Sequence, residues 1–382
     1  MSKNTVQYDA IIAGVGGMGS AALYNLAARG WKVLGLDKYD IPNNMGSSHG
    51  NSRIIRLSYH EHPSYVTLMR KSYELWDKLQ NDTNQELLIT TGSIRAGYEQ
   101  SSMFTGSKIA CDVHNIPYEI LDGKEVNKRF PGYSFPNDVL SVYQSDGGFL
   151  VADKCISSYL TLSDELGAEI HGREPITDWH PKGEAVEVVT PKSVYTANRL
   201  VLTSGPWVSK LFPDLTEVLV PERQVVGWFQ TLDPKKFNPD HFPVFGLEVD
   251  IGRFYGFPSF EIPGVKLGKY NHLREIVDPD LINRDITEDD QRTLSECLEK
   301  YFPTAHGPVM KMETCMFTNT PDGHFIVDKH PEFPQISIAA GFSGHGFKFC
   351  GLVGEIMADL AQYGYTEHNI DLFKLERFNR SI

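Results

Sequence analysis

Two arginines that could hold an anion, Arg53 and Arg56, lie three residues apart just after a loop that contains His49. If this segment is helical, both guanidinium groups lie on one helix face, where they could bind a carboxylate or a phosphate. The formal net charge of the chain is −13, so a local pair of cations needs a local reason. The alternative is a solvated basic face whose arginines pair with surface acids, and such pairs contribute little to stability.

A second feature with chemical potential is the glycine-rich turn at 344–348, Gly-His-Gly-Phe-Lys. We expect it between a strand and a helix, because an apolar run precedes it and a helical pattern follows. Turns of this kind can lay backbone N–H groups against a bound cofactor. The turn therefore predicts one wall of a ligand site far downstream of the arginines.

The most specific pattern is a G-x-G-x-x-G motif formed by Gly14, Gly16 and Gly19, directly after the apolar run at 10–13. We expect Gly14 to turn the chain, Gly16 to let the backbone approach a pyrophosphate and Gly19 to let a helix pack on a strand. The helix N-terminus would then offer free N–H groups to phosphate. The alternative is an ordinary βαβ unit with a tight turn.

An acidic residue completes this unit, because the apolar run at 33–36 ends in Asp37. A carboxylate about 20 residues after the glycines is typical of a group that binds ribose hydroxyls. An acid at this position favours FAD or NAD over NADP, which carries a 2′-phosphate. The motif does not choose between FAD and NAD.

Length and charge exclude several classes of protein. A chain of 382 residues can form two domains, or one large domain with insertions. A net charge of −13 repels polyanions, so nucleic acid and anionic membranes are poor partners. No apolar segment is long enough to cross a bilayer, and we expect a cytoplasmic protein. The five cysteines are scattered and contain no C-x-x-C pair, so we predict neither a disulfide framework nor a metal site.

The secondary structure that must position these residues differs between the ends and the middle of the chain. Segments near both ends read as strands followed by helices, whereas the middle of the chain reads as strands rich in aromatic residues and separated by turns. That order predicts two interleaved domains. We expect helices at about 17–28, 63–79, 152–166, 287–302 and 349–360, and strands at 10–13, 33–36, 87–98, 118–121, 139–144, 168–170, 185–190, 195–203, several within 224–269, 325–328 and 336–340.

Together these motifs resemble the monomeric sarcosine oxidase and N-methyltryptophan oxidase family of flavoproteins, over the whole length of the chain. The matching stretches are the glycine motif with Asp37, 46–56, 255–258, 266–268, 315–318 with 321–322, 324–328 and 341–348. The stretch at 341–348 is highly specific.

The resemblance implies a fold and a cofactor. It implies an α/β protein in which a Rossmann-type FAD-binding domain, from residues 1–84, 146–218 and 321–382, is interleaved with an α+β substrate domain. The substrate domain, from 85–145 and 219–320, would be built on a mainly antiparallel sheet. FAD would be joined covalently to the sulfur of Cys315, which composition alone would assign as a small buried hydrophobe. The residues implied in cofactor binding are Gly14, Gly16, Gly19, Asp37, Ser47, Cys315, Gly344, His345 and Gly346.

The resemblance also implies roles in catalysis. Lys266 matches the lysine that serves oxygen activation, and a fixed cation near the flavin would stabilise superoxide as it forms. The alternative for Lys266 is an exposed lysine on a strand. Arg53 matches the arginine over the flavin face, and His49 and Tyr255 match residues that line the same cavity.

Arg56 and Lys348 match the pair that holds the substrate carboxylate in the family. The implied reaction is oxidation of an N-methyl or other secondary amino acid, with hydride transfer to FAD, hydrolysis of the imine to aldehyde and amine, and reoxidation by O₂ to give H₂O₂. Alternatives are a cyclic imino acid oxidase acting on pipecolate or proline, a flavin dehydrogenase with another acceptor, and a non-catalytic dinucleotide-binding module. We expect a monomer whose partners are a small amine carboxylate and O₂.

Three departures from the family pattern bear on the substrate. The histidine four residues beyond the oxygen-activating lysine is replaced by Tyr270, although His272 lies close by and a local shift could bring it in. The tyrosine two residues after the flavin-linked cysteine is replaced by Phe317. Gly246 stands where sarcosine oxidases place a methionine, and a missing side chain there would enlarge the cavity. The changes suggest a larger or less polar amine than sarcosine; the alternative is neutral drift.

Overall fold

The structure, a computed structural model, describes residues 7–378. Strand β1 (Tyr8–Ala13) is central to an eight-stranded sheet, where it pairs in parallel with β2 (Val33–Leu36) and β12 (Val194–Leu202). Its apolar residues are almost wholly buried, as expected for a parallel strand that is covered on both faces. The other strands of this sheet are β9 (Glu169–His171), β10 (Asp178–Lys182), β11 (Ala185–Val189), β18 (Ile326–Lys329) and β19 (Ile336–Ala340).

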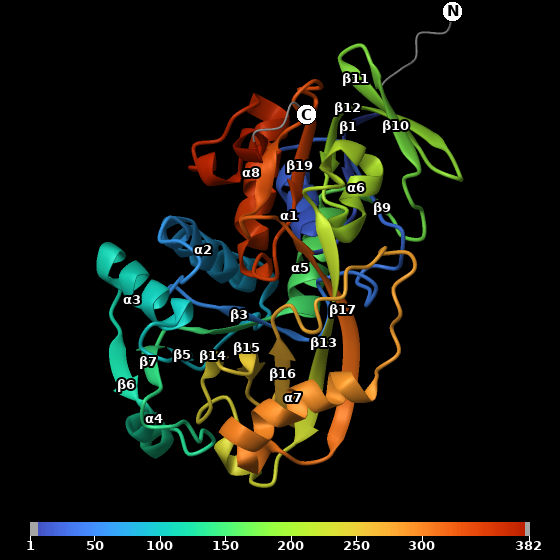
Figure 1. Ribbon diagram of the computed structural model, residues 1–382. Coiled ribbons are helices and arrows are strands. Elements are labelled where there is room, and N and C mark those ends of the chain that lie inside the picture. The colour runs from blue at the N-terminus through green and yellow to red at the C-terminus, as the bar shows by residue number, and fades with distance from the viewer. Residues whose placement is uncertain (1–6, 379–382) are drawn as a thin grey trace, which may run out of the picture.

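Helices cover this first sheet, in the upper half of Figure 1. Helix α1 (Gly17–Ala28) packs against α8 (Cys350–Tyr363) and α5 (Ala152–Glu165). The packing of α1 on α8 is close, because a Cβ atom on Gly354 would lie 2.6 Å from that of Ala21. Helix α2 (Tyr65–Thr83) packs on α8 as well, and the short α6 (Val208–Leu211) follows β12.

A second eight-stranded sheet forms the lower half of Figure 1, and only the β14–β5 pair in it is parallel. Aromatic side chains dominate its core, with α7 (Glu288–Tyr301) packed on one side. A capping box between Thr287 and Asp290 fixes the start of α7. The strands, in order across the sheet, are β17 (Val309–Asn319), β13 (Val220–Gln230), β16 (Gly264–Lys269), β15 (Gly252–Phe257), β14 (Val244–Val249), β5 (Ser93–Gly97), β7 (Leu140–Gln144) and β6 (Glu119–Asp122).

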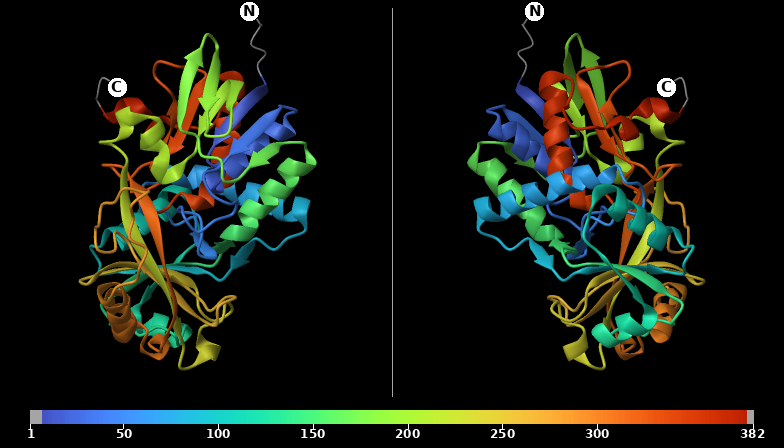
Figure 2. Two further views of the ribbon diagram at one scale, coloured as in Figure 1. Left: turned by 90° about the vertical axis from the view of Figure 1, so that its right-hand side faces the viewer. Right: turned by 90° about the vertical axis from the view of Figure 1, so that its left-hand side faces the viewer.

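Two connections join the halves. A three-stranded sheet of β3 (Ser52–Ile55), β8 (Gly148–Val151) and β4 (Leu88–Thr90) forms one of them. The other is the long pair β13 and β17, which Figure 2 shows reaching from the lower sheet toward the upper one. The end of β17 meets the turn after β19, where the Ser343 N–H donates to the Thr318 carbonyl at 3.0 Å. Residues near the end of β17 therefore lie beside the glycine-rich turn at 344–348.

The predicted fold class is confirmed: a Rossmann-type parallel sheet is interleaved with a mainly antiparallel one. The proposed domain boundaries stay a prediction. Helices α3 (Ser102–His114) and α4 (Gly123–Arg129) were not predicted. The arginine segment is not helical, so the condition for Arg53 and Arg56 to share a helix face is not met: 52–55 forms β3, whose β-branched residues pair with the buried strand β8. Among residues 7–378, no helix is long and apolar enough to cross a membrane.

Candidate active site

A cavity of about 520 Å³ lies at the carboxyl ends of β1, β2 and β12, the edge at which open parallel sheets bind their ligands. Its lining continues to the end of β17 and to the turn after β19. Residues from both halves of the molecule thus share one cavity. The lining includes 13–18, 36–39, 46–49, 203–207, 315–318 and 341–348.

The glycine motif shapes one end of this cavity. Gly14 has φ +91°, a conformation that favours glycine, and a Cβ atom there would lie 2.6 Å from the Cα of Ser204. On Gly19 a Cβ atom would lie 1.9 Å from the Gly14 carbonyl oxygen, so helix and turn touch. On Gly16 its nearest neighbour would be the Ser48 hydroxyl, at 3.5 Å, which leaves the backbone open to a ligand. The three glycines have the geometry predicted for a pyrophosphate cradle.

Asp37 lies beside this cradle and is 8% exposed. Its carboxylate accepts hydrogen bonds from the N–H groups of Val15, at 2.8 Å, and Tyr39, at 2.9 Å. Burial raises the pKa of Asp37, while these N–H groups lower it. A fixed carboxylate at the end of β2 fits the ribose of a dinucleotide.

Cys315 lines the same cavity from β17 and is 4% exposed. Burial raises the pKa of its thiol, whereas the nearby charges of Arg53 and Lys266 lower it. One cavity thus carries the dinucleotide cradle and, further along its lining, a buried thiol next to two cations. The residues present fit FAD.

Lys266 is 2% exposed and stands behind the lining rather than in it. Its Nζ donates to the carbonyls of Gly50, at 2.5 Å, and Ser52, at 2.9 Å. Burial, and then the charge of Arg53, lowers the pKa of Lys266 well below its usual value. The lysine is therefore a buried group held in one position by the backbone of the loop before β3.

His49 comes from that loop and Arg53 from β3, and both line the cavity. The Arg53 guanidinium donates to the carbonyls of Ser52, at 2.9 Å, and Ser47, at 2.8 Å, and it also bonds the His49 carbonyl. The His49 ring lies with Nδ1 3.6 Å from the Glu313 carboxylate, and burial lowers its pKa. These contacts fix the cationic edge of the cavity.

Three aromatic rings form another wall. Tyr255 and Tyr270 have ring centroids 5.0 Å apart, and Tyr270 and Phe317 lie at 6.1 Å. Phe317 packs on Gly344, where a Cβ atom would lie 2.5 Å from the phenyl ring. All three side chains line the cavity, as predicted from the sequence.

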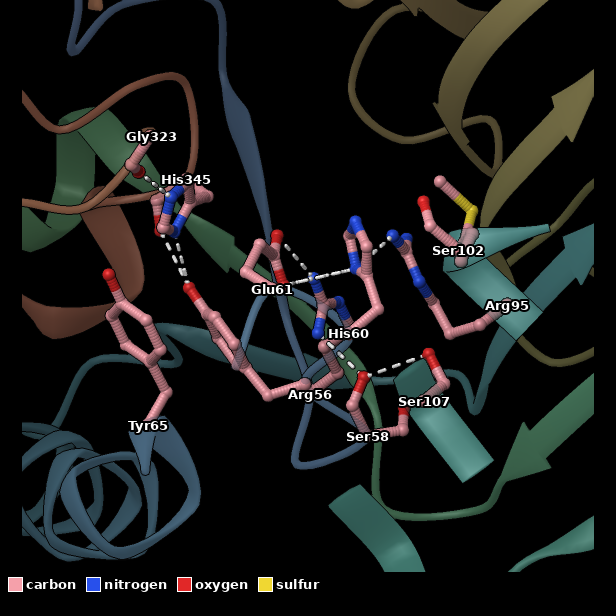
Figure 3. Close-up of polar contacts among 12 residues, drawn as sticks. Arg56, Ser58, His60, Glu61, Tyr65, Arg95, Ser102, Ser107, Gly323 and His345 are labelled. Atoms are coloured by element: carbon pink, nitrogen blue, oxygen red, sulfur yellow. Dashed lines mark hydrogen bonds and ion pairs between the residues drawn. The ribbon is translucent and has the colours of Figure 1, made fainter. Parts of the chain in front are cut away.

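The turn at 344–348 is fixed by hydrogen bonds (Figure 3). His345 Nε2 donates to the Gly323 carbonyl at 3.0 Å, which leaves Nδ1 to accept from the Tyr59 hydroxyl at 2.6 Å. Lys348 lines the cavity and donates to the His345 carbonyl at 2.7 Å. Burial, and then the charge of Arg56, lowers the pKa of Lys348 to about 7.

Arg56 does not line the cavity, contrary to its predicted role as a free carboxylate ligand. It is 1% exposed, and one guanidinium nitrogen lies 2.9 Å from each oxygen of Glu61 (Figure 3). The other nitrogen donates to the Ser58 carbonyl at 2.6 Å. Arg56 lies near Lys348, and its partner in this structure is Glu61.

Two expectations about substrate specificity are wrong. The space left by Gly246 does not enlarge the cavity, because the guanidinium of Arg95 fills it: a Cβ atom on Gly246 would lie 2.0 Å from Arg95 Nη1. His272 does not replace the missing histidine, since its Nε2 lies 2.9 Å from the Asp290 carboxylate, away from the cavity lining. Asp290 is in turn held by Arg223.

Sequence reasoning missed Arg95, His60 and Glu61, which gather around Arg56 in Figure 3. A signal was present at Arg95: it is a charge within the short, otherwise uncharged strand β5, where every residue is buried. The residues around Arg95 in the sequence did not indicate which side chain it would contact. Among residues 7–378 no cluster of three or more His, Cys, Asp or Glu is placed to hold a metal ion.

Comparisons with known proteins agree with this geometry. The FAD dependent oxidoreductase family matches residues 9–360. Monomeric sarcosine oxidase of Bacillus sp. (strain NS-129) is 40% identical over 378 residues, covering 98% of this chain and 97% of that protein. N-methyl-L-tryptophan oxidase of Yersinia pestis (strain Pestoides F) is 31% identical over 377 residues, covering 98% of this chain and all of that protein.

Solved structures share the fold. NikD, an unusual amino acid oxidase essential for nikkomycin biosynthesis, superposes in its open form with a TM-score of 0.84 at 24% identity, over 97% of this chain and 98% of that chain. Glycine oxidase from Geobacillus kaustophilus gives a TM-score of 0.80 at 18% identity, over 98% and 99%. The predictions of the family, of FAD and of a flavoprotein oxidase acting on a CH–NH group are confirmed. With its cradle, its buried thiol and these relatives over nearly its whole length, the chain belongs to the FAD-dependent oxidoreductases and, among them, to the monomeric sarcosine oxidase and N-methyltryptophan oxidase family.

Proposed function

We propose that this protein oxidises N-methyl or otherwise secondary α-amino acids, with FAD bound covalently to Cys315 and O₂ as the electron acceptor. The observation that carries the proposal is the shared cavity, in which Cys315 and Arg53 lie on the same lining as Lys348. This lining supplies a thiol for the cofactor and cations for an anionic substrate. When bound, FAD accepts a hydride from the carbon next to the amine and passes the electrons to O₂.

Lys348 is a cation in the lining that is available to a substrate carboxylate, since its ammonium group has three donors and one of them bonds the His345 carbonyl. Arg56 would assist from behind, and its bond to Glu61 must then loosen or be shared. Fixing the carboxylate orients the amine within the cavity, which lowers the entropic cost of reaching the reactive geometry.

The aromatic wall of Tyr255, Tyr270 and Phe317 would enclose the amine and exclude water from it. His49 stays neutral near pH 7, because burial lowers its pKa. An uncharged imidazole there adds no further repulsion toward a protonated amine substrate. The His49 side chain therefore does not oppose the approach of the amine.

Lys266 and Arg53 would serve the second half of the reaction. Both are held by backbone carbonyls of the 47–52 segment, so their positions are fixed before the reaction starts. Preorganised positive charge stabilises negative charge that develops on oxygen. In sum, R–NH–CH₃, O₂ and H₂O give R–NH₂, formaldehyde and H₂O₂.

A peroxide assay across amines tests the proposal. We expect H₂O₂ from N-methyl amino acids, with one formaldehyde released for each H₂O₂, and none from the matching 2-methoxy acids, in which an ether oxygen replaces the amine nitrogen. Peroxide without formaldehyde from pipecolate or proline would favour the cyclic imino acid oxidase. Reduction of an artificial dye with no peroxide from any substrate would favour a dehydrogenase.

We also propose that the protein acts alone, as a monomer in the cytoplasm, on small molecules. The name of the sarcosine oxidase relatives, which describes them as monomeric, supports the first part. Light scattering of the purified protein at micromolar concentration would give 43.0 kDa for a monomer. A doubled mass would contradict it.

A further inference from the structure

Arg95 belongs to a row of residues that runs across the second sheet. The register pairs Arg95 on β5 with Gly246 on β14, Gly246 with Tyr255 on β15, and Tyr255 with Gly268 on β16. Paired residues point to the same face of a sheet. The guanidinium of Arg95 lies over Gly246, just as the Tyr255 ring lies over Gly268. Since Tyr255 lines the cavity, Arg95 lies on the face of the sheet that the cavity borders.

Within residues 7–378 the Arg95 guanidinium has no acidic partner. It is 1% exposed, its Nε makes no hydrogen bond, and its Nη2 lies 3.2 Å from His60 Nδ1. No carboxylate within residues 7–378 forms an ion pair with it, whereas the partly buried Arg253 of the same sheet binds Glu248 at 2.8 Å. Burying a charge without a partner is costly, so such a charge in a folded protein calls for a reason.

The charges around Arg95 do not balance. Arg56, Arg95 and Lys348 are all buried, and of these only Arg56 pairs with a carboxylate of the described residues, that of Glu61 (Figure 3). His60 cannot supply a negative charge, and burial lowers its pKa to about 3, so the ring is neutral and its Nδ1 accepts from the arginines. The charge of Arg95 and, below about pH 7, that of Lys348 therefore remain for a ligand to neutralise.

Arg95, like Arg56, is not part of the cavity lining, but it lies near Tyr270, which is. Tyr270 lines the cavity and lies close enough to both guanidiniums, of Arg56 and of Arg95, to influence the pKa of each. Burial, and then the charge of Arg56, lowers the pKa of Arg95 to about 9, so the group is still cationic at neutral pH. Both guanidiniums reach the same atom, His60 Nδ1, at 3.1 and 3.2 Å.

We propose that Arg95 binds a second carboxylate of the substrate, so that the preferred substrates are secondary amines with two acidic groups, such as N-methyl-aspartate or N-methyl-glutamate. The inference rests on the proposed function and names its substrate class. Lys348 and Arg56 hold the carboxylate next to the amine, and Arg95 holds the one on the side chain. Gly246 is required because any side chain there would displace the guanidinium.

The test compares N-methyl-L-glutamate with its uncharged isostere N-methyl-L-glutamine, and N-methyl-L-aspartate with N-methyl-L-asparagine. For the FAD-loaded protein we expect kcat/KM for each acid to exceed that for the amide by roughly tenfold or more, as for removal of one partner of a buried charge pair. Arg95→Met should abolish this preference, so that kcat/KM for each acid falls to that for its amide. Gly246→Ala, which keeps the charge and displaces it, should reduce the preference as well.

Arg253→Met is the matched control, because it removes an arginine of the same sheet that already has a carboxylate partner. We expect it to keep the preference for the acids. An equal kcat/KM for acid and amide in the unmodified protein, or a preference that survives Arg95→Met, would overturn the inference.

Binding provides a readout that does not depend on turnover. Succinate should bind the FAD-loaded protein more tightly than its monoamide succinamate, by roughly tenfold in calorimetry, and Arg95→Met should remove the difference. If N-methylglycine and N-methylalanine are oxidised but the acids have no advantage in turnover or binding, Arg95 lacks this role while the proposed function stands. If no secondary amine is oxidised and succinate still binds through Arg95, the proposed function fails and the anion site stands.

Discussion

The guanidinium of Arg56 holds both carboxylate oxygens of Glu61 at 2.9 Å. Breaking a buried pair by removing one partner costs about 3–5 kcal/mol, because the remaining charge is left without compensation. Glu61→Gln should therefore lower the free energy of unfolding by about 3 kcal/mol at pH 7, measured by urea denaturation. The double variant Arg56→Met/Glu61→Gln should recover most of the loss. A single variant as stable as the parent would contradict the role of this pair.

The same pair predicts a pH dependence. The charge of Arg56 holds the pKa of Glu61 well below its usual value of 4.5, against the opposing effect of burial. A carboxyl with a lowered pKa contributes stability that is present above its unfolded pKa and is lost as the pH falls through its folded pKa. The difference in unfolding free energy between the parent and Glu61→Gln should be constant from pH 8 to 5 and shrink below about 4.5. A difference that grew on acidification would refute this sign.

Cys315 should retain the flavin through acid precipitation. We expect the yellow colour of the parent protein to stay in the pellet, and that of Cys315→Ala to move to the supernatant. Cys350 is the matched control, because it is another buried cysteine that lines the same cavity. Cys350→Ala should keep its colour in the pellet. Release of the flavin from Cys350→Ala but not from Cys315→Ala would show that Cys350 carries the covalent link.

Lys266→Met should slow the reaction of the reduced protein with O₂ by roughly 100-fold, the effect of removing one preorganised electrostatic contact to a developing oxyanion. Stopped-flow mixing with O₂ measures this step, and anaerobic reduction by substrate should change little. Lys311→Met is a matched control, since both ammonium groups lie over the Trp228 ring, at 5.4 Å for Lys266 and 5.3 Å for the exposed Lys311. Equal reoxidation rates in the two variants would rule out a special role for Lys266.

Lys348 should make carboxylate binding pH-dependent. Its pKa of about 7 means that the side chain is cationic below pH 7 and neutral above it. The affinity for methoxyacetate, which has an ether oxygen in place of the amine of sarcosine, should fall by up to about tenfold per unit as the pH rises above 7. Calorimetry between pH 6 and 9 measures this fall. Lys348→Arg, which stays charged, should bind with little change over the range, and a flat profile in the parent would exclude the lysine.

Much of the cofactor site could be predicted from sequence because its requirements are local. Gly14 takes a positive φ that favours glycine, and Gly19 leaves no room for a side chain. Asp37 follows the second strand directly and needs no distant partner to reach the cradle. The resemblance to a known family added Cys315, and strand β17 brings it to the predicted cavity.

The substrate end of the cavity could not be predicted in the same way. Helical spacing suggested one face for Arg53 and Arg56, but the segment is a strand because β8 pairs with it. Gly246 suggested an empty space, and the space belongs to Arg95, a residue far away in the sequence. The sequence by itself determined the dinucleotide cradle, whose backbone geometry only certain residues permit. The tertiary structure alone decided which charges meet, because the register of β5 with β14 and the path of the loop after β3 set those contacts between distant parts of the chain.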